Sequence, residues 1–552
     1  MPLISTVILA GNMDRRLKPR HLHSPRLCLI DRLPTEILGL IFKCLWRETE
    51  PHPRLDIETW PWYHPAHPSL VHITHVSHRW REIALDIPLL WSRVDDRLSS
   101  RMLAFLHRSR TSPISLSACF SGSRRGSSGC LVESIPTSCR GRLRRLDVRL
   151  EASDIFTQPR LDFSAPLLQV LTLQCEIYTG VNIVYHPILF QGETSSLKAM
   201  ALLHIRHWLP GNRFPNLAHL NISYFFMEEL PLTVLTHLLA NCPRLESLHL
   251  GQVWSYTLFD LDLAPPAAPV RLPHLRSISS CCASLQAMSA LVSNLVLPKD
   301  VRIRIHQAPV QQHTTAHENL LPLLDFMKPL THLELAADSS KLYLLAESDD
   351  GTGAIWIQAT WDVGEPSVWY DWLGYLHEML VLSAIRTFHV SVRDWTVVAP
   401  LLERMSALSV LGLMAFPDDA THELMLSAIC AVLECTRPVI CPDLRTLSVQ
   451  CNSRPCVGHI LRMAAQRADA DSQLSRLILD KVRLHHATGE EITIDEHDLA
   501  SLLAYVDDVD IGEGGVCTWE ERTGWGPDVE YWRLPVGDEA RCVFPWHAAS
   551  GD

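Results

Sequence analysis

The 552-residue sequence lacks several features that would place it in a familiar class. It has no run of about 18 uncharged apolar residues, so we expect no transmembrane helix and no membrane partner. Its 16 cysteines include no pair with zinc-type spacing, and those at 430, 435 and 441 are spaced too irregularly for such a site. Basic residues are not in excess: 49 Lys and Arg against 61 Asp and Glu give a net charge of −12, which argues against broad nucleic-acid binding.

Motifs for common enzyme chemistry are missing as well. The His-Glu pairs that begin at His317, His377 and His422 do not continue as His-Glu-x-x-His, and neither a P-loop nor a Gly-x-Ser-x-Gly elbow occurs. The segment HHATGEEITIDEH (485–497) gathers histidines and carboxylates, but such a stretch is more typical of a solvated loop leading into a helix. We therefore expect no metal, no cofactor and a protein that binds rather than reacts.

The composition is that of a folded globular chain, with 47% hydrophobic and 20% charged residues. Several cysteines stand at core-like positions, as in NCPRL and ICPDL, where a reduced thiol behaves as a small hydrophobe. This use of cysteine indicates a reducing compartment, cytoplasmic or nuclear. The apolar start of residues 1–26 is not preceded by a basic residue, which favours a flexible N-terminus over a signal peptide.

A short helical unit is predicted at residues 27–95. Pro34 suits a first helical turn, and apolar residues at helical spacing follow it. A Pro- and His-rich loop is expected at 47–69, after which one helix runs from Leu70 to Ala84 and ends before Pro88. So small a unit leaves apolar surface to be covered, either by the following chain or by another protein.

The stretches LPTEILGLIFKCLW and THVSHRWREIALDIPLLWS resemble the F-box, in the form typical of fungal (basidiomycete-type) F-box proteins. That resemblance implies docking to the Skp adaptor of a cullin–RING (SCF) ubiquitin ligase, while the rest of the chain captures a substrate. The long loop at 47–69, and Ser77-His78 where the family often has Cys-Arg, depart from the compact pattern. The residues carried over as adaptor-facing or box-forming are Leu33, Pro34, Ile37, Leu38, Ile41, Phe42, Leu45, Val76, Trp80, Arg81, Leu85, Pro88 and Trp91.

A leucine pattern dominates residues 140–510. Leu-x-x-Leu-x-Leu, with other apolar residues allowed, recurs as LRRLDV (143), LQVLTL (168), LKAMAL (197), LAHLNI (217), LESLHL (245), LTHLEL (330), IRTFHV (385), LSVLGL (408), LRTLSV (444) and LSRLIL (474), with LRSISS (275) a partial match. Each ending alternates as a strand requires, and helix-like segments lie between the motifs, at 231–242, 397–407, 422–435 and 457–466. The fold class predicted is therefore α/β, a small all-helical F-box followed by an irregular leucine-rich-repeat-like solenoid.

Three segments fall outside this pattern. Residues 96–139 are expected to be a linker helix and a flexible loop that contains SGSRRGSSG. The insertion at 341–372 begins with a β-hairpin around Asp350-Gly351, and residues 511–552 form a cap or tail. The basic residues near 140–149 are interpreted as the solvated face of a strand.

The predicted function is substrate recognition for an SCF-type ligase, without catalysis by this chain. Aromatic residues just after strands are candidate substrate anchors, but we favour a role in filling gaps between irregular repeats for them, and the same holds for Trp356 and Trp361. Two alternatives stay open: a scaffold whose F-box-like unit is a cap or acts outside a ligase, and an enzyme with a dispersed site. The candidate substrate-binding residues are Trp208, Tyr224, Phe225, Trp254 and Tyr256.

Overall fold

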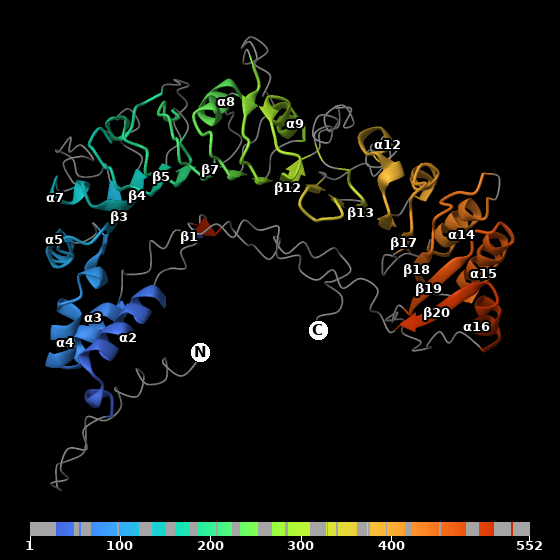
Figure 1. The fold of residues 1–552 in the computed structure, drawn as a ribbon, viewed down its shortest axis with the longest axis horizontal. Helices are drawn as coiled ribbons and strands as arrows, with labels where there is room; N and C mark the ends of the chain where they lie inside the picture. Colours follow the sequence, from blue (N-terminus) through green and yellow to red (C-terminus); the bar gives the residue numbers. More distant parts are fainter. Residues whose placement is uncertain are drawn as a thin grey trace, which may run out of the picture.

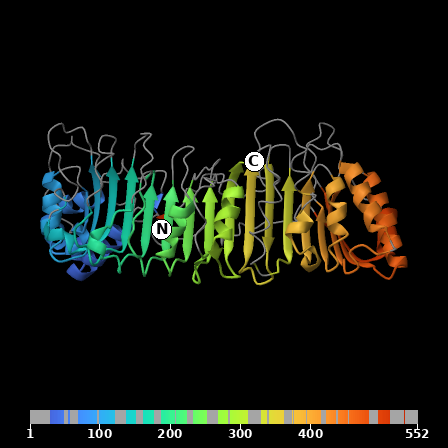
Figure 2. The same cartoon turned by 90° about the horizontal axis from the view of Figure 1, so that it is seen from above.

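The computed structural model forms an arch with strands along its inside and helices outside (Figure 1). Seen from above, the strands lie side by side from one end of the arch to the other (Figure 2). The described residues are 29–48, 55–56, 68–95, 99–120, 135, 137–150, 161–175, 186–205, 208–223, 232–251, 268–281, 285–309, 327, 329–337, 341–360, 373, 376–392, 395–413, 422–435, 438–451, 454–481, 496–512 and 532–533.

The N-terminal end of the arch is a small helical unit. Its elements are η1 (Leu29–Arg32), α2 (Thr35–Glu48), α3 (Pro68–Val76), α4 (His78–Leu85), η2 (Pro88–Trp91) and the short strand β2 (Arg93–Asp95). The prediction of a single helix from Leu70 to Ala84 is wrong, because the helix is interrupted at Ser77 and divides into α3 and α4. This residue has an extended backbone (φ −156°, ψ 165°), and its hydroxyl accepts a hydrogen bond from the Trp80 amide at 3.2 Å, which caps α4.

One large sheet runs through the arch. Its strands pair in the order β2, β3, β4, β5, β6, β7, β8, β10, β12, β15, β14, β13, β16, β17, β18, β19 and β20. Every pairing in it is parallel except the two that β14 makes with β13 and β15. The bounds are β3 Ile114–Phe120, β4 Leu143–Leu150, β5 Val170–Cys175, β6 Ala199–Leu203, β7 His219–Ser223, β8 Ser247–Gly251, β10 Ser277–Cys281, β12 Arg302–Pro309, β13 His332–Ala337, β14 Lys341–Glu347, β15 Ala354–Thr360, β16 Thr387–Val392, β17 Val410–Leu413, β18 Thr446–Cys451, β19 Leu474–Lys481 and β20 Val506–Gly512.

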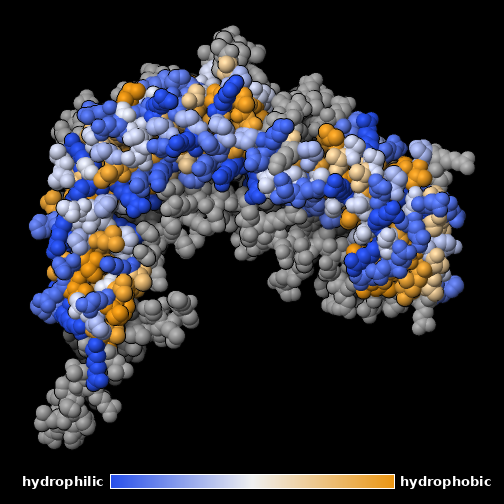
Figure 3. Space-filling view, viewed as in Figure 1, coloured by the Kyte–Doolittle hydropathy of each residue, from blue (hydrophilic) through white to orange (hydrophobic). Residues whose placement is uncertain are grey.

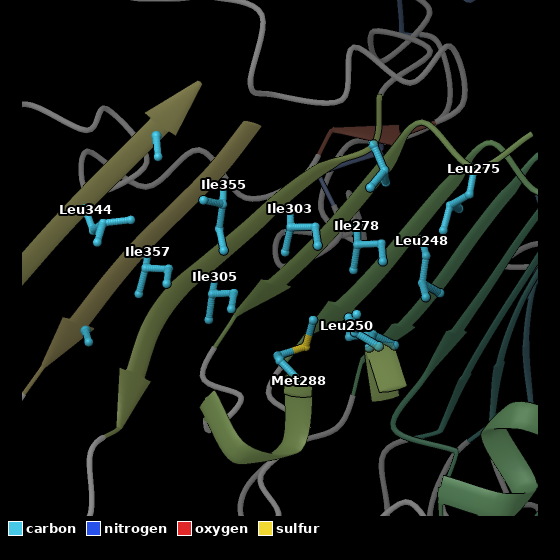
Figure 4. Packing of buried hydrophobic residues seen from close by; sticks show 14 of the residues in the cluster. Leu248, Leu250, Leu275, Ile278, Met288, Ile303, Ile305, Leu344, Ile355 and Ile357 are labelled. Carbon is cyan, nitrogen blue, oxygen red and sulfur yellow. The ribbon is translucent and has the colours of Figure 1, made fainter. Parts of the chain in front are cut away.

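Each leucine motif forms one strand of this sheet, as the alternation predicts. The leading apolar residue of every motif is buried, from Leu143 at 0% exposed to Leu330 at 7%. The fourth and sixth positions turn to the same side, so neighbouring strands stack Ile278, Ile303 and Ile355 in one apolar layer (Figure 4). Met288 of α9 (Leu285–Ser293) lies on that side of the sheet, so the core is the layer between strands and outer helices.

The outer layer consists of helices between strands. The helices predicted at 231–242, 422–435 and 457–466 are present as α8 (Leu232–Ala240), α14 (His422–Leu433) and α15 (Arg454–Asp469), whereas 397–407 holds only η7 (Trp395–Val397) and the short α13 (Ala399–Leu402). The remaining elements are α5 (Ser99–Arg108), α7 (Thr137–Arg140), α12 (Leu376–Met379), α16 (Glu496–Leu503), η4 (Phe190–Gly192), η6 (Leu382–Ala384) and the short pairs β1 (Leu55–Asp56) with β21 (Trp532–Arg533) and β9 (Val270–Arg271) with β11 (Leu295–Val296).

The sheet begins before residue 140. In the stretch predicted to be only a linker, β3 pairs with β4 along its whole length, and β2 pairs with β3. Ile114 and Leu116 alternate with serines and are buried, and Pro113 stands directly before them, but the segment lacks the leading leucine of the motif. The hairpin around Asp350 is present, and Gly351 takes the positive φ of +62° that its turn requires. It is part of the sheet rather than a projection from it.

Candidate functional site

The core of the helical unit is formed by the inward face of α2. Leu38 and Phe42 are fully buried (0% exposed) beneath α3 and α4. The indole ring of Trp80 lies tilted against Phe42, with ring centroids 5.2 Å apart. Trp80 is half-buried, so this contact holds α4 against α2 while part of the indole stays at the surface.

Arginine side chains tie the helices together through backbone carbonyls. Arg79 of α4 donates to the carbonyl of Leu33 at 2.6 Å, just before α2 begins. Arg81 donates to the carbonyl of Thr74 at 2.9 Å, across the break between α3 and α4. Because charge-assisted hydrogen bonds are stronger than neutral ones, these two fix the relative positions of the three helices.

An apolar stripe is left on the outward face of α2. Ile37 is 41% exposed and Leu40 is 55% exposed, and Pro34 precedes them at the same helical spacing. Figure 3 shows hydrophobic residues gathered over this helical unit. Since the inner face of α2 already has its partners, nothing in the packing of the described residues accounts for this outer stripe.

The structure sorts the residues carried over from the F-box pattern into three groups. Leu38, Phe42 and Trp91 are buried and form the box, whereas Leu33, Ile41, Leu45, Trp80, Leu85 and Pro88 are half-buried and Pro34, Ile37, Val76 and Arg81 are exposed. Sequence reasoning missed Leu40, which belongs to the exposed stripe. Its spacing from Ile37 was available, but its exposure depends on where α3 and α4 pack.

Trp91 joins the helical unit to the sheet. Its indole N–H donates to the carbonyl of Ala84 at 2.9 Å, and its ring meets Phe105 of α5 edge to face at 5.0 Å. The Arg108 guanidinium lies 4.5 Å from the centre of the same ring. The helical unit is therefore packed onto the rest of the arch at this end, while its α2 stripe stays exposed.

The inner face of the arch carries the side chains that the core does not use. With the leading apolar residue of each motif as position 1, positions 3 and 5 turn to this face. The strand register aligns every position 5 in one row across the sheet. From β4 to β20 the row is Asp147, Thr172, Ala201, Asn221, His249, Ser279, Arg304, Trp356, Leu345, Glu334, His389, Gly412, Ser448, Ile478 and Asp510.

The two ends of this face carry ion pairs. On β4, Arg145 lies 2.8 Å from Asp147, with 19% and 10% of their side chains exposed, so the solvated face predicted near 140–149 is wrong for Arg145. Burial raises the pKa of Asp147, and the charge of Arg145 opposes that rise. Across the arch, Arg476 of β19 pairs with Asp508 at 3.5 Å and with Asp510 at 2.9 Å on β20.

A basic and aromatic group occupies the middle of the row. The Arg304 guanidinium lies 4.6 Å from the centre of the Trp356 ring on the adjacent strand. Burial, and secondarily the charge of Arg304, lowers the pKa of His249 to about 3, so that imidazole is neutral at ordinary pH. Trp356 is only 3% exposed, so it packs within the face rather than projecting from it.

Two histidines and a glutamate meet further along the row. His332 and Glu334 lie on β13, His389 lies opposite Glu334 on β16, and His332 hydrogen-bonds to Glu334. One ligand atom from each of the three lies within 4.8 Å of the others. Burial, and then the neighbouring His332, lowers the pKa of His389 to about 4. Gly412 leaves room for this ring, because a Cβ there would lie 2.5 Å from His389 Cδ2.

This His-Glu-His cluster was not predicted from the sequence. A signal for it existed, since Glu334 and His389 both occupy position 5 of consecutive leucine motifs. In the segment 485–497, whose histidines and carboxylates were considered for metal, residues 485–495 lie outside the described residues, and Glu496 and His497 begin α16.

Of the five predicted substrate anchors, only Trp208 lies among the described residues. Trp208 is 7% exposed and belongs to the apolar core, which agrees with the gap-filling interpretation. Tyr224, Phe225, Trp254 and Tyr256 lie outside the described residues, as does Trp361.

Comparison with known proteins bears on the helical unit. The F-box-like family matches residues 30–97, which span η1 to the end of β2. A search of curated proteins finds no match to the chain. Among the described residues, no helix combines the length and apolar character needed to span a bilayer.

Proposed function

We propose that this chain, which carries an F-box-like domain at residues 30–97, is the substrate-recognition adaptor of an SCF-type ubiquitin ligase. In this proposal the box binds a Skp-type adaptor, and the arch is an irregular leucine-rich-repeat-like solenoid that binds a target protein. The chain itself performs no chemistry and acts by holding the target near the ligase, in the cytoplasm or nucleus.

One observation carries the proposal: the stripe of Pro34, Ile37 and Leu40 stays exposed on a box whose interior is already filled. Burying two such aliphatic side chains in an interface is worth about 2 kcal/mol or more, enough to anchor a partner helix. In this proposal the target binds elsewhere on the arch, on a surface separate from the α2 stripe.

The test is the affinity of the full chain for a purified Skp adaptor, measured by biolayer interferometry. The double change Ile37→Ala with Leu40→Ala should weaken Kd about thirtyfold, which corresponds to roughly 2 kcal/mol. The matched control is Leu103→Ala on α5, because Leu103 is equally apolar and 59% exposed but lies outside the box. A circular dichroism spectrum equal to wild type shows that the arch remains folded.

The competing interpretation is an interaction scaffold in which the box is only a cap. The packing of Trp91 against Phe105 is what such a cap requires. That interpretation expects no adaptor binding by the wild-type chain, and this result would reject the adaptor proposal. Equal binding by the wild type and the double variant would instead reject the α2 stripe as the docking face.

A further inference from the structure

We propose that His332, Glu334 and His389 bind a divalent transition-metal ion, for which Zn²⁺ is the best match, on the inner face of the arch. The inference does not depend on adaptor binding, because it concerns β13 and β16, far from the box along the sheet.

The donor set selects the class of ion. Two imidazole nitrogens and one carboxylate are a set that binds zinc, and the same set also suits other first-row transition metals such as Fe²⁺. Calcium and magnesium prefer all-oxygen sites, so they are poor matches. The three groups leave one coordination position of a tetrahedral ion for water or for a donor atom from a bound partner.

The distances are close to those a bound ion needs. In a tetrahedral site with metal–ligand bonds of about 2.1 Å, neighbouring ligand atoms lie about 3.4 Å apart. Here the three ligand atoms lie within 4.8 Å of one another, so modest rotations of the side chains close the site. On binding, the nitrogen of His332 that now hydrogen-bonds to Glu334 coordinates the ion, and any proton on it passes to solvent.

The scaffold holds these groups in place without metal. Glu334 and His389 are register partners on two paired strands, and His332 lies two residues before Glu334 on the same face. Gly412 on the next strand provides the space in which the His389 ring lies. Ligands on regular strands are positioned more accurately than ligands on loops, so little order has to be gained on binding.

Burial gives the cluster a reason to attract a cation. The Glu334 side chain is 1% exposed and that of His332 is 18% exposed. A carboxylate so far from water is costly unless positive charge or hydrogen bonds compensate it. Glu334 already accepts a hydrogen bond from His332, and a divalent ion between Glu334 and the two imidazoles would add positive charge beside this buried carboxylate.

The experiment uses the full chain, stripped of metal with a chelator and dialysed. Zn²⁺ is titrated in competition with a chromophoric chelator, and Co²⁺ in a parallel sample reports tetrahedral coordination through its visible absorption. The variants are His332→Gln, Glu334→Gln and His389→Gln. The matched control is His249→Gln, since His249 is a buried histidine of the same row outside the cluster.

The expected result is one tight Zn²⁺ equivalent in the wild type and in His249→Gln, with affinity at least tenfold weaker in each of the three cluster variants. The visible absorption of tetrahedral Co²⁺ should also disappear in these three variants. His332→Gln separates loss of metal binding from loss of folding, because the His332 side chain is more exposed than that of Glu334. Its thermal unfolding without metal should match that of the wild type. Equal zinc binding by all variants, or no tight equivalent in the wild type, would overturn the site and leave a His–Glu hydrogen-bonded cluster.

Discussion

Replacing Trp91 with alanine should detach the box from the arch. The side chain is 1% exposed, and removing a buried tryptophan costs about 3–5 kcal/mol through lost burial and the cavity that remains. The edge-to-face contact with Phe105 and the Arg108 guanidinium each add about 1 kcal/mol. Losing the hydrogen bond from the indole adds little to this cost, because the Ala84 carbonyl still accepts a hydrogen bond from the Ile87 amide at 3.3 Å.

We therefore expect Trp91→Ala to lower the free energy of unfolding of the box and the first strands by about 5 kcal/mol, measured by urea unfolding followed by circular dichroism. Trp91→Phe keeps a ring against Phe105 and should cost about 2 kcal/mol. Leu103→Ala, on the exposed side of the same helix as Phe105, should change the value by less than about 0.5 kcal/mol. A loss below about 1 kcal/mol in Trp91→Ala would refute the reasoning that this ring joins the two parts.

Two further predictions concern the inner face. His249 has a pKa of about 3 when folded and 6.5 as its ordinary value, so protons bind preferentially to the unfolded chain below 6.5. Its contribution to stability is thus complete above pH 6.5 and falls by about 1.4 kcal/mol per pH unit toward pH 3. Urea unfolding of His249→Gln should show a correspondingly flatter acid slope, and an unchanged slope would contradict the assignment. Gly412→Ala places a Cβ 2.5 Å from His389 Cδ2 and should cost about 1–3 kcal/mol in thermal unfolding, whereas Gly458→Ala, where nothing lies within 4 Å, should cost no such strain.

Most of the strands could be predicted because each leucine motif contains the local pattern that specifies a strand. A leading leucine, often announced by a proline, is followed by alternation, and both features are local. The strands β3 and β12 were missed because ISLSACF and RIRIHQAP, although Pro113 and Pro298 precede them, lack a leucine at the leading position of the motif. The break at Ser77 was missed because the apolar spacing continues across it from Leu70 to Ala84. Only the fold shows the extended backbone of Ser77 and the hydrogen bond that its hydroxyl accepts from the Trp80 amide.

The candidate sites were harder to predict than the strands. The exposure of Leu40 follows from which side of α2 the helices α3 and α4 cover, and that is decided by packing rather than by the sequence of α2. The meeting of Glu334 with His389 requires β13 to pair with β16, although β14 and β15 separate them along the chain. Position within a motif is local information, but which motifs become neighbours is not.

The reversed segment in the middle of the sheet has a consequence for how the chain folds. Elsewhere each strand pairs with one that precedes it closely, so the sheet can grow from a nucleus one strand at a time. Between β12 and β16 this is not so: β12 pairs with β15, and β16 pairs with β13, so the three strands from β13 to β15 have to be in place together before the two halves are connected. The junction is then the slow, all-or-none step in assembling the arch, because it closes longer loops than its neighbours do. The halves on either side can form early and separately, and only this junction makes them one cooperative molecule.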